Sequence, residues 1–289
     1  MPTLRQINRR IKSIQSTAKT TRAMSLVAGS KMRKAQLLAL SHRPYADQLS
    51  NLLADVVHSL EAAAEVEGDL HPLLARRENR NPLVIVLTSD RGQVGGMNTN
   101  LIRVAGNYVV QHPTSQIIAV GRKGFDFYRR AGATIMGQFI RLGDYPGFDD
   151  VRPISLLAAQ AFISGEVDSV NIVYPRFINT VVQRPELQEL LPAIPPADDD
   201  DKSDEYIFEP DAQTVLEDLL PRYVEIQVYR AILELAASEQ SARMVAMRNA
   251  TDAAQEMVEN LTLVRNKVRQ EQITKELLDI TGGVEAMNN

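Results

Sequence analysis

The chain has 289 residues, of which 44% are apolar, and this is enough for a hydrophobic core and too much for a disordered chain. It has no cysteine, which excludes disulfides, thiolate metal sites and cysteine nucleophiles. No run of about 18 apolar residues occurs, so we expect neither a membrane span nor a secretion signal.

Charge is distributed very unevenly along the chain, although the net charge is only −4. Residues 1–46 contain ten basic residues and no acidic one, and the first carboxylate is Asp47. A basic arm on an acidic body predicts an acidic partner surface, which could be protein, lipid or nucleic acid. A solvated helix face is the alternative, and composition alone leaves both open.

The N-terminal part, residues 1–69, is predicted to be a long amphipathic helix. Its apolar positions step by threes and fours, which is the spacing of one helix face, at Ile7, Ile11, Ile14, Ala18 and Thr21. A bend or break is expected near Arg43 and Pro44, because proline disfavours helical geometry in the residue before it.

Residues 70–220 are predicted to form an inserted globular α/β domain. The continuous aliphatic run at 83–87 suits a strand covered on both faces, and further strand and helix patterns alternate after it. Such alternation favours a doubly wound, mainly parallel sheet. The proline-rich and aspartate-rich stretch at 192–205 is expected to be a flexible acidic loop.

The C-terminal part, residues 221–289, is predicted to be one very long helix that starts after Pro221. Sixty residues, 222–281, pass without proline or glycine, which at 1.5 Å per residue gives a rod of roughly 90 Å. A heptad seam is expected at Val228, Ile232, Leu235, Glu239, Ala242, Ala246, Asn249 and Ala253. The partner predicted for this seam is the N-terminal helix, running antiparallel because the insert joins the two helices.

The residues that could carry chemistry are few. The turn at 90–96 follows a strand and precedes a helix, which is where glycine-rich loops bind phosphate, but it lacks both the phosphate-loop and the dinucleotide pattern. A nucleotide-binding enzyme with helical dimerisation arms therefore stays an alternative. Four scattered histidines show no metal-ligand spacing, so no metal site, catalytic residue or cofactor is expected.

Polar residues also gather near the end of the long helix. Arg269, Gln270, Thr274 and Glu276 lie within about two turns. They could hydrogen-bond to an enclosing partner, or they could be ordinary helix-surface polarity.

The sequence resembles the gamma subunits of F-type rotary ATP synthases over nearly its whole length. The resemblance rests on blocks at both ends and in the middle of the chain: 9–14, 23–24, 30–36, 43–45, 89–92, 95–96, 121–124, 237–247, 249–252, 266–267, 269–270, 273–274 and 276–277. Because these blocks occur together, the resemblance is specific. Glutamine and valine at positions 93 and 94 depart from the family, which often has leucine and cysteine there.

The resemblance implies a rotor made of an antiparallel coiled coil with an inserted α/β domain. Such a subunit holds no catalytic residue and transmits torque between a proton- or sodium-driven membrane ring and the catalytic hexamer. The implied partners are the alpha and beta subunits, the small rotor (epsilon) subunit and the membrane c-ring, with no nucleic acid and no cofactor. The implied location is the cytoplasmic face of an energy-transducing membrane, as in the bacterial plasma membrane.

The family positions that contact the beta subunits can be transferred residue by residue. They fall on Met24, Arg91, Arg243, Arg269, Gln270, Thr274 and Glu276. A nucleic-acid binder remains a third hypothesis for the basic arm, although the arm has no aromatic residue before Tyr45.

Overall fold

The computed structural model describes residues 3–62, 71–193 and 208–287. The elements are α1 (Leu4–Ala62), β1 (Pro82–Leu87), α2 (Met97–Gln111), β2 (Gln116–Val120), α3 (Arg122–Arg130), β3 (Thr134–Phe139), α4 (Phe148–Ile163), β4 (Ser169–Phe177), β5 (Gln183–Leu191) and α5 (Ala212–Met287). They form two compact units, one of residues 1–27 with 244–289 and one of residues 28–243. The expected loop at 192–205 lies, from residue 194 onward, outside the described residues.

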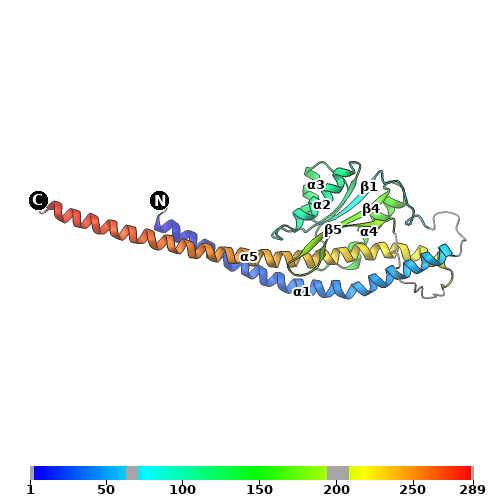
Figure 1. Ribbon diagram of the computed structural model, residues 1–289, viewed down its shortest axis with the longest axis horizontal. Coiled ribbons are helices and arrows are strands. Elements are labelled where there is room, and N and C mark those ends of the chain that lie inside the picture. The colour runs from blue at the N-terminus through cyan, green and yellow to red at the C-terminus, as the bar shows by residue number, and fades with distance from the viewer. Residues whose placement is uncertain (1–2, 63–70, 194–207, 288–289) are drawn as a thin grey trace. The chain divides into compact units, whose positions relative to one another are not determined.

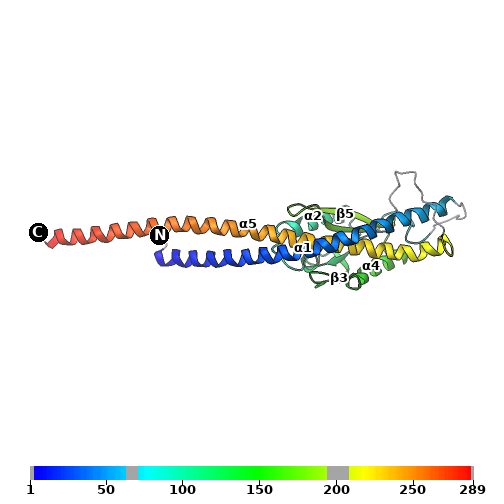
Figure 2. The same ribbon diagram turned by 90° about the horizontal axis from the view of Figure 1, so that it is seen from below.

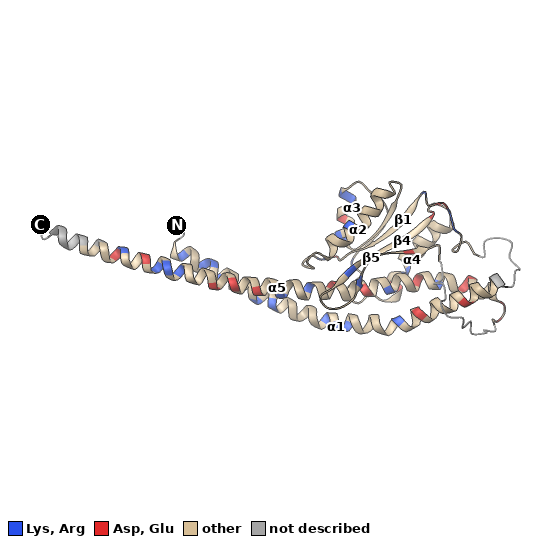
Figure 3. Ribbon diagram, viewed as in Figure 1, with Lys and Arg blue, Asp and Glu red and all other residues tan. Residues whose placement is uncertain are grey.

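The first unit is an antiparallel pair of helix segments (Figure 2). Ser25 Oγ donates to the Met244 carbonyl oxygen at 3.1 Å, and the hydroxyls of Thr21 and Thr251 are 2.7 Å apart. The earlier residue of α1 thus pairs with the later residue of α5, as antiparallel helices require. The predicted α1 seam is confirmed, because its apolar side chains are buried or half-buried. All charged positions of α1 before Asp47 are basic (Figure 3).

The second unit contains the same antiparallel pairing between the later part of α1 and the earlier part of α5. Ser50 accepts a hydrogen bond from Gln227 at 3.3 Å, and Asp47 forms an ion pair with Arg230 at 3.3 Å. Nearly every residue of α5 from 223 to 238 is buried, whereas a surface helix buries one face. Here α5 packs against α1 on one side and the α/β domain on the other.

The sheet of the second unit has the strand order β3-β2-β1-β4-β5, and only the β4 and β5 pair is antiparallel. The central strand β1 is fully buried because helices cover both faces: α2 and α3 lie on one, and α4 and α5 on the other (Figure 1). The doubly wound, mainly parallel fold predicted from sequence is therefore confirmed, together with the long helices.

Three local predictions are wrong. The break of α1 at Pro44 does not occur, since Pro44 lies inside a continuous helix, and Pro221 lies inside α5, which begins at Ala212. The heptad seam fails after residue 246, since Asn249 and Ala253 are exposed. The buried positions of that segment are Met247, Thr251 and Ala254.

Candidate functional site

The turn after β1, which resembled a phosphate loop, is closed by its own side chains. The Asn98 side chain accepts a hydrogen bond from the Ser89 backbone N–H at 3.1 Å and donates to Ser89 Oγ at 2.8 Å. Gln93 has a φ of 67°, a left-handed conformation that few residues other than glycine adopt. The closed turn leaves Arg91 and Gln93 exposed, so their side chains are free for contact with another surface.

The N-terminus of α3, where an anion would bind in many α/β proteins, is occupied by the chain itself. Asp90 Oδ1 accepts from the Arg122 backbone N–H at 3.0 Å, and the Ser89 carbonyl oxygen accepts from the Lys123 N–H at 3.2 Å. Thr88 Oγ1 accepts from the Gly124 N–H at 2.8 Å. These bonds satisfy the donors that would otherwise hold a phosphate.

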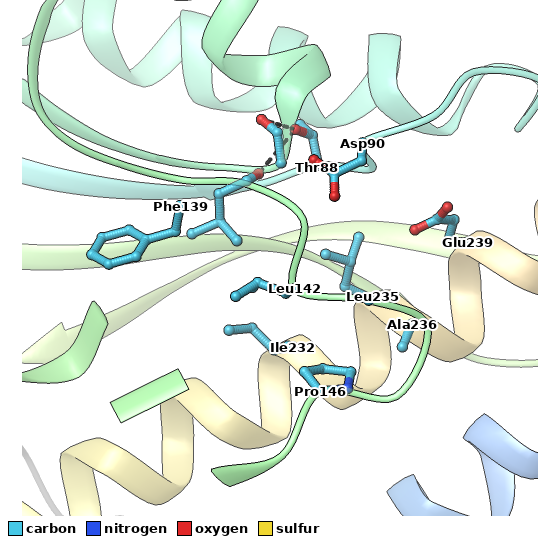
Figure 4. A pocket seen from close by; sticks show the side chains of 12 residues that line it. Thr88, Asp90, Phe139, Leu142, Pro146, Ile232, Leu235, Ala236 and Glu239 are labelled. Carbon is cyan, nitrogen blue, oxygen red and sulfur yellow. Dashed lines mark hydrogen bonds between the residues drawn. The ribbon is translucent and has the colours of Figure 1, made fainter. Parts of the chain in front are cut away.

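The cavity at this edge of the sheet is also too small for a nucleotide. Its volume is about 30 Å³, whereas small-molecule pockets usually have roughly 300–1,000 Å³. Asp90 and Glu239 line it together with apolar side chains of α5 and of the β3–α4 loop (Figure 4). This edge of the sheet therefore gives the nucleotide-binding alternative no support.

Glu239 and Arg243 form a charged pair where α5 passes the turn. Arg243 Nη2 donates to Glu239 Oε1 at 2.6 Å and to the Gly92 carbonyl oxygen at 3.4 Å. Burial raises the pKa of Glu239; Arg243 lowers that pKa, while the charges of Asp144 and Asp90 raise it further. Through Arg243 the pair connects α5 to the turn, but it also buries most of the Glu239 carboxylate.

We expect Glu239→Gln to remove a pH dependence of stability. A carboxyl whose pKa is raised by folding destabilises the native state at neutral pH, and this cost disappears as the pH falls through the folded pKa towards the unfolded one. The difference in free energy of unfolding, Glu239→Gln minus the unsubstituted chain, should thus be largest in favour of the variant at neutral pH. This difference should shrink as the pH is lowered. Thermal unfolding of the full chain against pH measures this.

The control for this test is Glu256→Gln, which changes an exposed glutamate of the same helix. It should leave the pH profile of the unfolding temperature unchanged. A profile for Glu239→Gln that runs parallel to that of the unsubstituted chain would contradict the expectation.

The structure brings two of the predicted contact residues together. Arg91 is exposed in the turn, and Arg243 bonds to the carbonyl oxygen of the next residue, Gly92. Arg243 thus contacts the turn that carries Arg91, and both residues belong to the second unit, but the Arg243 guanidinium is itself paired with Glu239. Met24 belongs to the first unit, where it is half-buried on α1.

The four predicted contact residues near the end of α5 are all exposed. At 3.6 residues per turn, Gln270 and Thr274 lie on one face, while Arg269 and Glu276 lie on another. The apolar Ile273 is also 49% exposed. A single flat surface could not contact all of these side chains at once.

Sequence reasoning missed the polar residues that fasten the α/β domain to α5. Glu234, with 3% of its side chain exposed, accepts a hydrogen bond from the Phe177 backbone N–H at 3.2 Å and is 3.7 Å from Arg43. Ser238 Oγ donates to the Pro175 carbonyl oxygen at 3.0 Å. The sequence did contain one signal for these contacts: Glu234 is a carboxylate inside an apolar run of helix, and a buried charge needs a partner.

Two general properties of the described residues bear on function. Within residues 3–62, 71–193 and 208–287, no three His, Asp or Glu side chains are grouped so that they could hold a metal ion. In the same ranges, no helix contains a segment both long and apolar enough to cross a membrane.

The chain is similar to known proteins over almost its full length. A protein-family model described as ATP synthase matches residues 3–287. The ATP synthase gamma chain of Dehalococcoides mccartyi is 49% identical, with 99% of this chain and 100% of the relative covered. That of Pelotomaculum thermopropionicum is 45% identical, with the same coverage.

Solved structures with a similar fold come from mitochondrial ATP synthases. A chain in the rotor of the Euglena gracilis enzyme matches with a TM-score of 0.66 and 19% identity, covering 93% of this chain and 98% of that one. A chain from the central stalk and c-ring of the Tetrahymena thermophila enzyme matches with a TM-score of 0.60 and 22% identity, covering 80% and 99%. At these identities the likeness concerns the fold.

Proposed function

The chain belongs to the ATP synthase gamma-chain family, and on that premise we propose that it is the central-stalk rotor of a proton- or sodium-driven ATP synthase. It transmits torque between the membrane ring and the catalytic hexamer of alpha and beta subunits. It is a non-catalytic subunit, and the chemistry of ATP synthesis takes place on its partners.

One observation carries the proposal: the last part of α5 exposes apolar side chains on more than one face. Leu277, Leu278 and Ile280 are 58%, 65% and 63% exposed, and successive residues of a helix point about 100° apart. One neighbouring helix would leave some of them in water, and exposed apolar patches mark interaction sites. A ring of subunits around the helix covers every face.

The predicted contact residues receive roles within this proposal. Arg269, Gln270, Thr274 and Glu276 face the surrounding beta subunits at the enclosed end of α5. Met24, Arg91 and Arg243 are the other proposed contacts with the beta subunits. Of these, the exposed Arg91 meets acidic loops of the beta subunits. Complementary charge of this kind steers association and fixes orientation more than it raises affinity.

The remaining parts of the proposal follow the three-part division of the chain. The long helices α1 and α5 form the shaft, and the α/β domain between them binds the small rotor (epsilon) subunit and the c-ring. The protein is a peripheral part of a membrane-associated complex. We place it on the cytoplasmic face of the bacterial plasma membrane, since its relatives include bacterial chains.

Co-expression with partner subunits tests the function. A tagged copy of this chain, produced with the alpha and beta subunits of the same organism, should purify as a complex that hydrolyses ATP. Alpha and beta subunits produced without the chain are the control and should show much less activity. Recovery of the tagged chain alone, with all ATPase activity in the fraction without it, would reject the proposal.

A further inference from the structure

The loop at 140–147, which joins β3 to α4, is bonded to both long helices through one carboxylate. Asp144 Oδ2 accepts a hydrogen bond from Lys31 Nζ of α1 at 2.7 Å. Its other oxygen, Oδ1, accepts from Gln240 Nε2 of α5 at 3.2 Å, and Gln240 is only 3% exposed. A single side chain of the α/β domain thus connects two helices that are far apart in sequence.

The next residue adds a second connection to α1. Tyr145 Oη donates to the Lys31 carbonyl oxygen at 3.4 Å, and Lys34 Nζ lies 4.4 Å from the centroid of the Tyr145 ring. A lysine over an aromatic face is attracted by the ring. Two consecutive loop residues therefore contact two lysines that are about one turn apart on α1.

The start of the same loop is fixed to the sheet. The Arg141 backbone N–H donates to Asp90 Oδ2 at 2.8 Å, and Asp90 Oδ1 accepts from the Arg122 N–H. Arg141 itself has a φ of 64°. A short path of directed bonds therefore runs from the edge of the sheet, through the loop, to both helices.

Apolar packing alone would hold these parts together without fixing their alignment. Leu142 and Pro146 of the loop line one small cavity with Ile232 and Leu235 of α5 (Figure 4). Apolar burial is non-directional, so it resists separation more than sliding. Charge-assisted hydrogen bonds have narrow distance and angle ranges, so they resist sliding.

We infer that Asp144 is a positioning residue for torque transfer, which holds the α/β domain in register with both shaft helices while the shaft carries load. The inference rests on the proposed rotor function. Loss of this carboxylate lets the domain slip against the helices under torque, so that ATP hydrolysis continues while less of it drives ion transport.

The test uses the complete ATP synthase in sealed vesicles, with a potential-sensitive dye as the readout of ATP-driven ion transport. Asp144→Ala and Lys31→Ala should each lower the ratio of transport to ATP hydrolysis, and the double variant should lose no more than the larger single loss. Asp149→Ala, which removes an exposed carboxylate in the first turn of α4, is the matched control and should keep the full ratio.

A charge exchange separates alignment from simple damage to the fold. Lys31→Asp combined with Asp144→Lys restores an ion pair of reversed polarity and should recover part of the lost ratio. An unchanged ratio in Asp144→Ala, or a charge exchange no better than the single variants, would overturn the inference. Failure of the unsubstituted chain to join the complex would instead reject the rotor function.

Discussion

Asp252→Pro should abolish coupled ATP synthesis. Asp252 is an exposed residue of α5, next to the seam residue Thr251 that contacts Thr21 of α1. Proline there removes a backbone hydrogen bond and clashes with the preceding turn, at a cost of about 3 kcal/mol or more. A kinked shaft cannot stay paired with α1 and rotate about one axis. Synthesis by the reconstituted complex under an imposed ion gradient measures the effect.

The control for the helix break is Asp252→Ala, which removes the same charge and keeps a strong helix former. Its complex should synthesise ATP at close to the unsubstituted rate. If the complex with Asp252→Pro also did so, an intact α5 would not be needed for coupling, and the shaft function assigned to it would be wrong.

Gly121→Ala should strongly destabilise the α/β domain. Gly121 has a φ of 86°, and an added Cβ would lie 1.9 Å from the Thr88 carbonyl oxygen, a backbone atom that cannot turn aside. Left-handed strain and overpacking together should cost about 3 kcal/mol or more. The free energy of unfolding of the full chain, measured with urea, should fall by this amount.

Gly132→Ala separates the two causes. Gly132 also has a positive φ, of 74°, but an added Cβ meets no atom within 4 Å. We expect a loss of about 1 kcal/mol from backbone strain alone. Equal losses in the two variants would show that the close approach of β2 and the Thr88 backbone contributes nothing.

The main elements could be predicted because their signals are local and repeated. The aliphatic run of β1 indicated a strand buried on both faces, and the seam from Ile7 to Thr21 indicated a helix with one covered face. Both patterns mark the side chains that become buried when the chain folds. The antiparallel order of the long helices followed from the single insert between them.

The wrong predictions have a common physical reason, which is that packing overrides local preference. Pro44 is tolerated inside α1 because the helix that continues after it buries Ala46, Leu49 and Leu53 in the core of the second unit. Pro221 is tolerated in α5 because Leu216 and Leu220 before it are fully buried. The gain from that burial exceeds the cost of a missing helical hydrogen bond.

The polar connections could be predicted least. Asp144 lies in a loop, where no periodicity distinguishes a residue that bonds two helices from one that faces water. The contacts of Glu234 were easier to predict, because a carboxylate within an apolar run of helix needs partners. The contact residues on α5 were recognised through the family resemblance, since their spacing alone is that of an ordinary polar helix.

As a rotor, this chain must rotate inside a ring of alpha and beta subunits. The most direct measurement immobilises the complex through its beta subunits, attaches a visible probe to an introduced cysteine on this cysteine-free chain, and supplies ATP. We expect unidirectional rotation of the probe that stops when ATP is removed. A probe that stays fixed while the same complexes hydrolyse ATP would contradict it.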